Sequence, residues 1–227
     1  IALGLARRGA NIVVHYNTST ADARRIVAEI KAVGVDALAV KADQSSPGQV
    51  KSAVARAVRH FGSLDILVAS AAVYKKTPFD TLTEADWDFH LDVNLKGPFL
   101  FALEVGRHLK RRKRAGKIIL FADWAAIRPY AYYLPYCVSK AGIICLTKSL
   151  AKALAPRVQV NAIAPGPVLL PPDFTAAQKR AVINATLVKR VGSPQDIVNS
   201  VLFLIEGSDF ITGHVLVVDG GRLIAGS

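Results

Sequence analysis

The 227-residue sequence contains no methionine and only two cysteines. It also has no run of about 18 apolar residues and no signal-peptide pattern, so we predict no membrane-spanning helix and no secretory leader. Cys137 and Cys145 lie eight residues apart in one predicted helix, too far apart for a disulfide. We interpret them as free thiols of a reducing compartment and predict a cytoplasmic protein. Without an initiator methionine, we expect that some chain preceded Ile1.

Acidic residues are scarce, because 17 Asp and Glu stand against 29 Lys and Arg, for a formal net charge of +12. Part of the excess lies in the run from Arg107 to Arg114. Such a run serves either an anionic partner, for example an acidic carrier protein, or a solvated helix end whose cations suit the helix dipole. No nucleic-acid motif accompanies it. We therefore favour the helix end, and expect no nucleic acid, no membrane and no metal as partners.

Strand and helix patterns alternate along the chain. Strands are predicted at 11–16, 37–41, 64–69, 116–122, 158–163 and 214–219, and helices at 19–33, 46–61, 83–110, 135–154 and 194–205. The third helix is expected to bend near Gly97-Pro98, and 165–187 to be irregular. Alternation of this kind predicts an α/β fold, a Rossmann-like doubly wound parallel sheet flanked by helices, in one domain over 1–227.

Candidate site residues gather where predicted strands end. Asp43, Ser70, Asp123 and Pro165-Gly166 each follow a strand, and the carboxyl ends of parallel strands form the ligand-binding edge of such a sheet. Tyr136 and Lys140 lie one helical turn apart, so a phenol would stand beside an ammonium. A nearby positive charge lowers a tyrosine pKa, which suits a proton donor. By itself such a pair is common in helices, and the surrounding motifs decide its meaning.

The motifs together resemble the short-chain dehydrogenase/reductase family over essentially the whole chain. They are Tyr136-x-x-x-Lys140 followed by Ala141-Gly142, Asn94 within Asp92-Val93-Asn94-Leu95, Asn161-x-x-x-Pro165-Gly166, and Ile211-Thr212-Gly213 leading to Val218-Asp219-Gly220-Gly221. Each motif is weak alone, but this order and spacing are specific. The resemblance implies an NAD(P)-dependent oxidoreductase acting on a small molecule.

The resemblance also implies roles for single residues. Tyr136 would donate the proton, Lys140 would lower the tyrosine pKa and hold the nicotinamide ribose, and Asn94 would hold the water of a proton relay. Cofactor contacts would come from Asp43 at the adenine, from Ser70, and from Pro165, Gly166 and Val168 near the nicotinamide amide. The family's usual tetramer would form through helices 94–110 and 135–154 and the last strand.

The sequence departs from the family at its beginning, where the glycine-rich phosphate loop and the strand before it are absent. In the family's strand order that strand lies between 11–16 and 64–69, so both would be left with unpaired backbone groups. We expect that roughly 15–20 residues of a complete binding fold are missing at the N-terminus.

A second departure concerns the substrate. Asp123 stands where the family has a serine, 13 residues before Tyr136. An ionised aspartate only accepts hydrogen bonds, so it suits a substrate with N–H groups and opposes a carbonyl oxyanion. Pteridine reductases of this family have this aspartate, and Tyr74 matches their substrate-stacking aromatic residue. We predict reduction of a pterin-like heterocycle. Two alternatives stay open: reduction of a 3-oxoacyl thioester or ketone, and a non-catalytic nucleotide-binding protein.

The expected cofactor is NADP rather than NAD. An acid at the end of the second strand of such a fold would bind the adenosine ribose and select NAD. Here the place reads His15-Tyr16-Asn17-Thr18-Ser19, without an acid. A neutral loop in a basic protein tolerates the 2′-phosphate, and His15, Asn17 and Ser19 are its predicted contacts.

Overall fold

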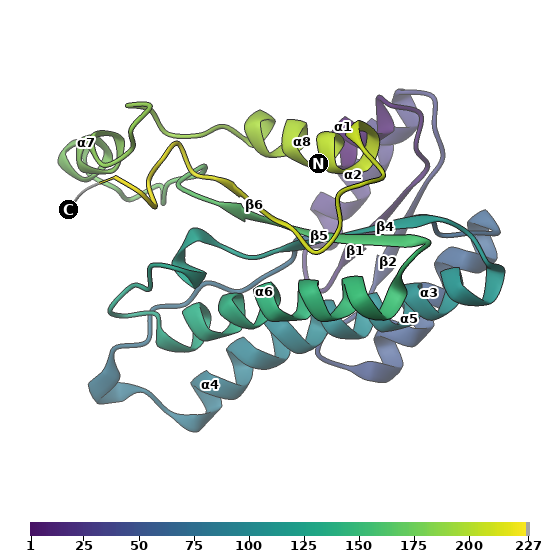
Figure 1. The fold of residues 1–227 in the computed structure, drawn as a ribbon, viewed down its shortest axis with the longest axis horizontal. Coiled ribbons are helices and arrows are strands. Elements are labelled where there is room, and N and C mark those ends of the chain that lie inside the picture. Colours follow the sequence, from purple (N-terminus) through teal and green to yellow (C-terminus); the bar gives the residue numbers. More distant parts are fainter. Residues whose placement is uncertain (226–227) are drawn as a thin grey trace.

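The computed structural model describes residues 1–225, in which helices cover both faces of parallel β-structure (Figure 1). The strands are β1 (Ile12–Tyr16), β2 (Ala37–Lys41), β3 (Ile66–Ala69), β4 (Gly116–Phe121), β5 (Val158–Pro165) and β6 (Val215–Val218). The α-helices are α1 (Ala2–Ala6), α2 (Thr20–Ala32), α3 (Pro47–Phe61), α4 (Glu84–Leu91), α5 (Gly97–Arg112), α6 (Leu134–Leu154), α7 (Ala176–Asn184) and α8 (Pro194–Leu202). The predicted α/β class with parallel strands is confirmed.

Two separate hydrophobic cores hold the layers together. One lies beneath the sheet, where α3, α5 and α6 pack against β4 and β5, with Leu109, Ile118 and Ile143 fully buried. The other lies on the opposite face under α1, α2 and α8, around Ile30 and Ile163. Strands buried on both faces require continuous apolar sequence, and β4 supplies it in Ile118-Ile119-Leu120.

The parallel strands form two sheets rather than one. β1 pairs only with β2, while β3, β4, β5 and β6 form a four-stranded sheet in that order. Between β1 and β3 lies a cleft of about 570 Å³. Its walls include Val13 and Val14 of β1, Leu67 and Val68 of β3, and Phe101 of α5. This is the separation expected for two strands that lack a common neighbour.

Two segments differ from the sequence prediction. The helix expected over 83–110 is divided by a π-helical turn at Asp92–Lys96, one turn before the expected bend at Gly97. The segment 165–187, predicted to be irregular, contains α7. A capping box between Thr175 and Gln178 starts this helix, with the Gln178 amide donating to the Thr175 hydroxyl at 3.2 Å. The proline-rich sequence before Thr175 obscured that signal.

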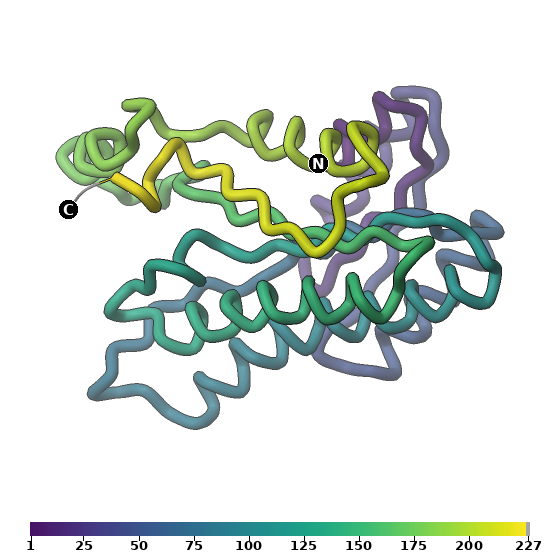
Figure 2. Tube along the Cα trace, viewed as in Figure 1, coloured from purple at the N-terminus to yellow at the C-terminus, as the bar shows by residue number. Residues whose placement is uncertain are grey.

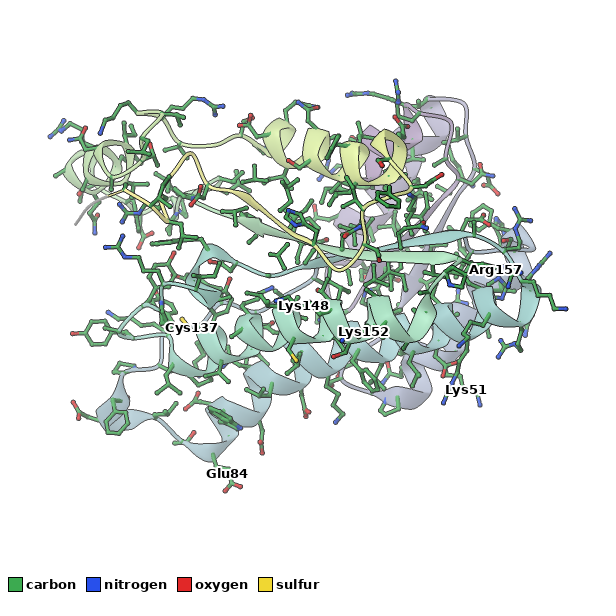
Figure 3. The ribbon with its side chains drawn as sticks, viewed as in Figure 1. Lys51, Glu84, Cys137, Lys148, Lys152 and Arg157 are labelled. Atoms are coloured by element: carbon green, nitrogen blue, oxygen red, sulfur yellow. The ribbon has the colours of Figure 1, made fainter. Side chains whose placement is uncertain are left out.

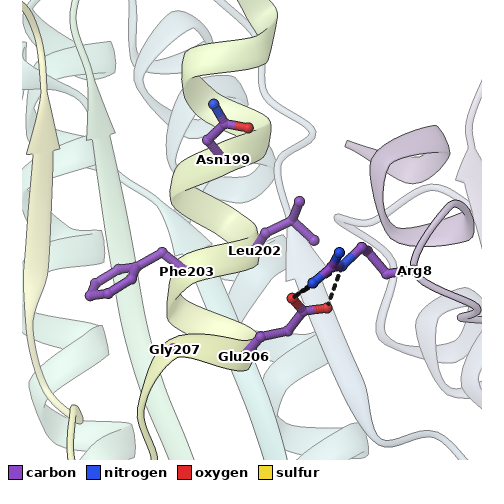
Figure 4. A pocket seen from close by; sticks show the side chains of 6 residues that line it. All are labelled: Arg8, Asn199, Leu202, Phe203, Glu206 and Gly207. Carbon is purple, nitrogen blue, oxygen red and sulfur yellow. Dashed lines mark hydrogen bonds and ion pairs between the residues drawn. The ribbon is translucent and has the colours of Figure 1, made fainter.

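A shallow pocket lies between the end of α1 and the π-helical turn Phe203–Gly207 after α8 (Figure 4). Arg8 and Glu206 face each other across it, with the Arg8 Nη2 donating to the Glu206 Oε2 at 2.7 Å. Both side chains are exposed, so this ion pair contributes little to stability. Within the described residues, no helix is both long and apolar enough to cross a membrane.

Candidate active site

Asp123 and Tyr136 form the centre of the candidate site. β4 ends at Phe121, and Asp123 caps the short 3₁₀ turn Trp124–Ala126, where its Oδ1 accepts from the Ala125 amide at 2.7 Å. Its Oδ2 accepts from the Tyr136 hydroxyl, also at 2.7 Å. The strand end and the first turn of α6 therefore present one hydrogen-bonded carboxylate–phenol pair.

Lys140 lies one turn further along α6, as the spacing predicted, and is buried. Its Nζ donates to the Phe121 carbonyl at 2.8 Å and lies 5.8 Å from the centre of the Tyr136 ring. The structure brings the predicted trio of Asp123, Tyr136 and Lys140 together. The lysine bonds to the end of β4 rather than to the phenol itself.

The electrostatics of this trio follow from burial. Burial lowers the pKa of Lys140 to about 8, and Asp123 partly opposes that shift. Burial also raises the pKa of Asp123, against hydrogen bonds from Ala125 and Tyr136. The pKa of Tyr136 is strongly raised, by burial first and by the Asp123 charge second. The predicted lowering of the tyrosine pKa is therefore wrong for this structure, because burial and the nearby Asp123 carboxylate both disfavour the phenolate.

Asn94 holds the backbone around the site instead of pointing at Tyr136. It lies fully buried in the π-helical turn Asp92–Lys96. Its Oδ1 accepts from the Val73 amide at 2.8 Å, and its Nδ2 donates to the Val73 carbonyl at 2.9 Å and to the Ser139 hydroxyl at 3.2 Å. Asn94 thus fastens the loop after β3 to α6. A π-helical turn at such a place is frequent at functional sites.

A cluster of aromatic rings surrounds the pair. The Tyr74 ring stacks on the Tyr133 ring with 4.4 Å between centroids and meets the Tyr136 ring edge-on at 4.8 Å. Tyr130 contacts both Tyr133 and Trp124 edge-on. Tyr74 is 54% exposed, so part of its ring surface remains available to a planar ligand although Tyr133 covers one face. Nothing in the local sequence predicted the Tyr74–Tyr133 contact.

The predicted cofactor residues lie along the same edge, at the ends of other strands. Asn17, Ser19 and Ser70 are exposed there. Asp43 accepts from the Ser45 hydroxyl at 2.7 Å, a bond that lowers its pKa. His15 is different: its Nε2 is 2.8 Å from the Ala42 carbonyl, and burial lowers its pKa. An engaged, half-buried imidazole that tends to be neutral is a poor phosphate contact.

The predicted cofactor residues at the end of β5 lie beside the chain that follows β6. Pro165, Gly166 and Val168 are partly exposed at the strand end. A side chain at Gly166 would come within 2.6 Å of the Asp219 backbone, so only glycine allows β5 and the chain after β6 to approach this closely. The glycine requirement is a packing constraint that also brings the two strand ends together beside the site.

The basic run lies at the opposite end of the sheet. The run lies at the end of α5, just before β4 begins at Gly116. Asp123 lies just beyond the other end of β4. A strand of this length separates the two ends by about 15–20 Å. Figure 3 shows Arg157, which bonds to Gly116, far from Cys137 near the site. Within the run, Arg112 bonds to the Gly62 carbonyl and Lys110 to the Ala153 carbonyl. This geometry favours the solvated helix end.

Three contributors were missed by sequence reasoning. Gln44, buried after β2, donates from its Nε2 to the Val93 carbonyl at 2.7 Å and braces the turn that holds Asn94. Trp124 and Arg222 face each other, with 5.2 Å between the guanidinium carbon and the indole centroid. Arg222 is 98 positions beyond Trp124 in the sequence, so no local pattern connects them.

The residues present fit the nicotinamide end of a dinucleotide. Lys140 is buried and its pKa is lowered, which is typical of a residue in a functional site. The close approach of Gly166 to Asp219 provides backbone groups at the neighbouring strand ends. Lys140 would hold the ribose, and the backbone near Gly166 would hold the carboxamide. When bound, the nicotinamide supplies a hydride.

Comparison with known proteins matches the chain across its length. A family profile described as "Enoyl-(Acyl carrier protein) reductase" covers residues 1–222. The 3-oxoacyl-[acyl-carrier-protein] reductase of Staphylococcus aureus is 37% identical over 97% of this chain and 91% of its own length. The galactitol 2-dehydrogenase of Agrobacterium fabrum is 34% identical over 97% and 91%.

Solved structures share the fold. A putative gluconate dehydrogenase from Agrobacterium tumefaciens superimposes with a TM-score of 0.91 at 34% identity, covering 98% of this chain and 89% of that one. The acetoin dehydrogenase of Enterobacter cloacae gives 0.90 at 30% identity, covering 99% and 90%.

Proposed function

Because the chain belongs to the short-chain dehydrogenase/reductase family and is an NAD(P)-dependent oxidoreductase, we propose that it reduces a pterin-like heterocycle with NADPH. The expectation of the family is confirmed. The pteridine-reductase subtype rests on the site alone, since the names of the relatives point elsewhere. The single observation that carries the proposal is the 2.7 Å bond from the Tyr136 hydroxyl to Asp123.

The relatives favour the alternative, reduction of a 3-oxoacyl thioester or another ketone. Their names describe carbonyl and alcohol chemistry, and none of those cited names a pterin. They also act on different substrates at nearly the same identity to this chain: an acyl carrier thioester at 37% and galactitol at 34%. Similarity at this level supports the reaction type. The substrate depends on the site residues, which is why Asp123 leads our proposal.

The chemistry of the pair favours a substrate that carries N–H groups. An ionised Asp123 accepts such an N–H but cannot donate to a carbonyl oxygen, and its charge repels a developing oxyanion. When a substrate N–H donates to the Asp123 carboxylate, the Tyr136 hydroxyl no longer has to donate there. It can then donate its proton to the substrate ring atom next to that N–H. Lys140, a cation below about pH 8, supports the proton transfer. The aromatic cluster at Tyr74 offers a stacking surface for a planar ring.

The proposal is tested by comparing two substrates under the same conditions. With NADPH, we expect dihydrobiopterin to be reduced with a kcat/KM at least about tenfold above that of acetoacetyl thioester, because one charge-assisted hydrogen bond is worth that much. The measurement is NADPH oxidation at 340 nm. A thioester that is reduced faster would move the assignment to the ketone reductase. Tight NADPH binding without turnover of either would leave a non-catalytic nucleotide-binding protein.

We further propose NADP as the cofactor, a homotetramer as the assembly and the cytoplasm as the location. The loop after β1 has no acid to select NAD, and Asn17 and Ser19 are exposed there. Apolar side chains on the outside of α5 and α6 support the tetramer, among them Phe99 and Val138. Cys145 is exposed and unpaired within residues 1–225, which suits a reducing compartment.

We propose that an extended apolar strand completes the single domain by filling the cleft between β1 and β3. Every second backbone amide of each strand faces that cleft, and unpaired buried amides are costly. A parallel strand would satisfy both edges and join the two sheets into one. Cofactor binding would then depend on it, because the residues at the end of β1 and those at the end of β4 sit on separate sheets.

A six-residue peptide rich in valine and isoleucine tests this proposal. We expect its addition to slow hydrogen exchange at Ile12–Tyr16 and Ile66–Ala69 about tenfold or more and to strengthen NADPH binding. A peptide with proline at alternate positions is the matched control, since it lacks the required amides. Amides that are already protected in the chain alone would contradict the proposal, as would tight NADPH binding that the peptide leaves unchanged.

A further inference from the structure

The chain after β6 returns to the loop that follows β4. In Figures 1 and 2 the C-terminal trace continues beyond the end of β6 toward α7. Two contacts place it beside the loop after β4: the Arg222 guanidinium stacks over the Trp124 ring at 5.2 Å, and the Arg128 Nη1 donates to the Ala225 carbonyl at 3.2 Å. Arg222 therefore lies beside the candidate site, although it is 98 positions after Trp124 in the sequence.

This arginine is half-buried and has no anionic partner within residues 1–225. None of the ion pairs among those residues includes it. The nearest acid in sequence is Asp219, and its carboxylate accepts from the Gly221 and Leu223 amides at 2.8 and 2.6 Å. A partly buried cation is usually paired, so a guanidinium left with only an aromatic face is available to a ligand.

Its position relates it to the catalytic pair. Trp124 directly follows Asp123 in sequence and contacts the Tyr130 ring edge-on at 5.2 Å. The Tyr130 pKa is raised by burial and by Asp123 and is lowered in part by Arg222, so both charges act on the same phenol. Arg222 and Asp123 thus both lie close to the pair of rings formed by Trp124 and Tyr130.

We propose that Arg222 is a specificity-determining residue that binds a carboxylate on the substrate, outside the ring that is reduced. The stacked guanidinium keeps its N–H edge for a ligand and matches a carboxylate in shape. One cation balances one negative charge, which suits a carboxylate better than a phosphate dianion. The inference rests on the proposed function for the nature of the ring, and it adds the acidic substituent.

Pterin fluorescence provides a binding test that needs no turnover. Pterin-6-carboxylate and 6-hydroxymethylpterin share the ring and differ in the charged group. We expect the protein to bind the carboxylate about 10- to 100-fold more tightly, the range for a hydrogen bond between charged groups. Arg222→Gln should remove this preference, Arg222→Lys should keep part of it, and Arg180→Gln, the same charge change on exposed α7, should leave it intact.

The outcomes separate this inference from the proposed function. Equal binding of the two pterins by the unaltered protein would overturn it, and so would an Arg222→Gln variant that weakens both equally, which is the result of a structural role. If neither pterin binds, the pterin proposal fails and the same comparison is made with acetoacetate and ethyl acetoacetate as substrates. A preference for acetoacetate that Arg222→Gln removes would still support the carboxylate contact. If the unaltered protein shows no such preference, the proposed contact is overturned.

Discussion

Replacing Asp123 with serine is expected to invert the substrate preference. The kcat/KM for a dihydropterin should fall about 10- to 100-fold, because the substrate N–H loses a charged acceptor. The kcat/KM for a ketone should rise by a similar factor, because a neutral hydroxyl donates to the carbonyl and the repelling charge is gone. The measurement is NADPH oxidation with dihydrobiopterin and with acetoacetyl thioester.

The fold should survive this change. Asp123 caps the turn Trp124–Ala126 through the Ala125 amide, and serine is an equally good cap. Asp123→Asn is the control for charge, since it keeps the shape and should also lose dihydropterin reduction. Unchanged preference in both variants would remove Asp123 from substrate recognition.

The same substitution changes the pH dependence, with a sign that follows from the carboxyl group. Burial raises the pKa of Asp123, so the ionised form that accepts an N–H is present at high pH and is lost as the pH falls through that raised pKa. Dihydropterin reduction should therefore have an acidic limb that Asp123→Ser removes. Ketone reduction should show the opposite trend in the unaltered protein, because only a protonated Asp123 donates.

Tyr136→Phe is expected to lower kcat about 10²- to 10⁴-fold on either substrate class, which is the usual contribution of a positioned proton donor. The ring remains, so its edge-on contact with Tyr74 is kept. The lost hydroxyl leaves Asp123 Oδ2 without its partner, which should cost about 1–3 kcal/mol of stability. Steady-state kinetics and thermal unfolding measure the two effects separately.

A matched control for this variant is Tyr132→Phe. Tyr132 is 54% exposed, lies four positions earlier and contacts Lys76 rather than Asp123 or Tyr136. It should retain activity and stability. Retention of more than a tenth of kcat by Tyr136→Phe would exclude this phenol as the proton donor.

The sequence alone was sufficient for the order of the elements and for the identity of the central trio. Apolar runs and helix caps are local, so β1 and β4 were predicted to within a residue, and the four-residue spacing of Tyr136 and Lys140 needs only a helical turn. Asp123 was found because it ends a strand, and parallel strands end at a common edge. The gap between β1 and β3 was also expected, because the strand that lies between them in the family's strand order is absent from this sequence.

Only the tertiary structure decided how these groups act on one another. The tyrosine pKa was predicted to be lowered and is raised, because burial and the Asp123 charge both disfavour the phenolate. The spacing of residues in the sequence reveals neither effect. Asn94 binds Val73 and Ser139, and His15 binds Ala42, because long-range packing sets the partner of each polar group. Local chemistry thus determines which residues stand at the strand ends. The folded packing determines their charges and contacts, including the meeting of Arg222 with Trp124.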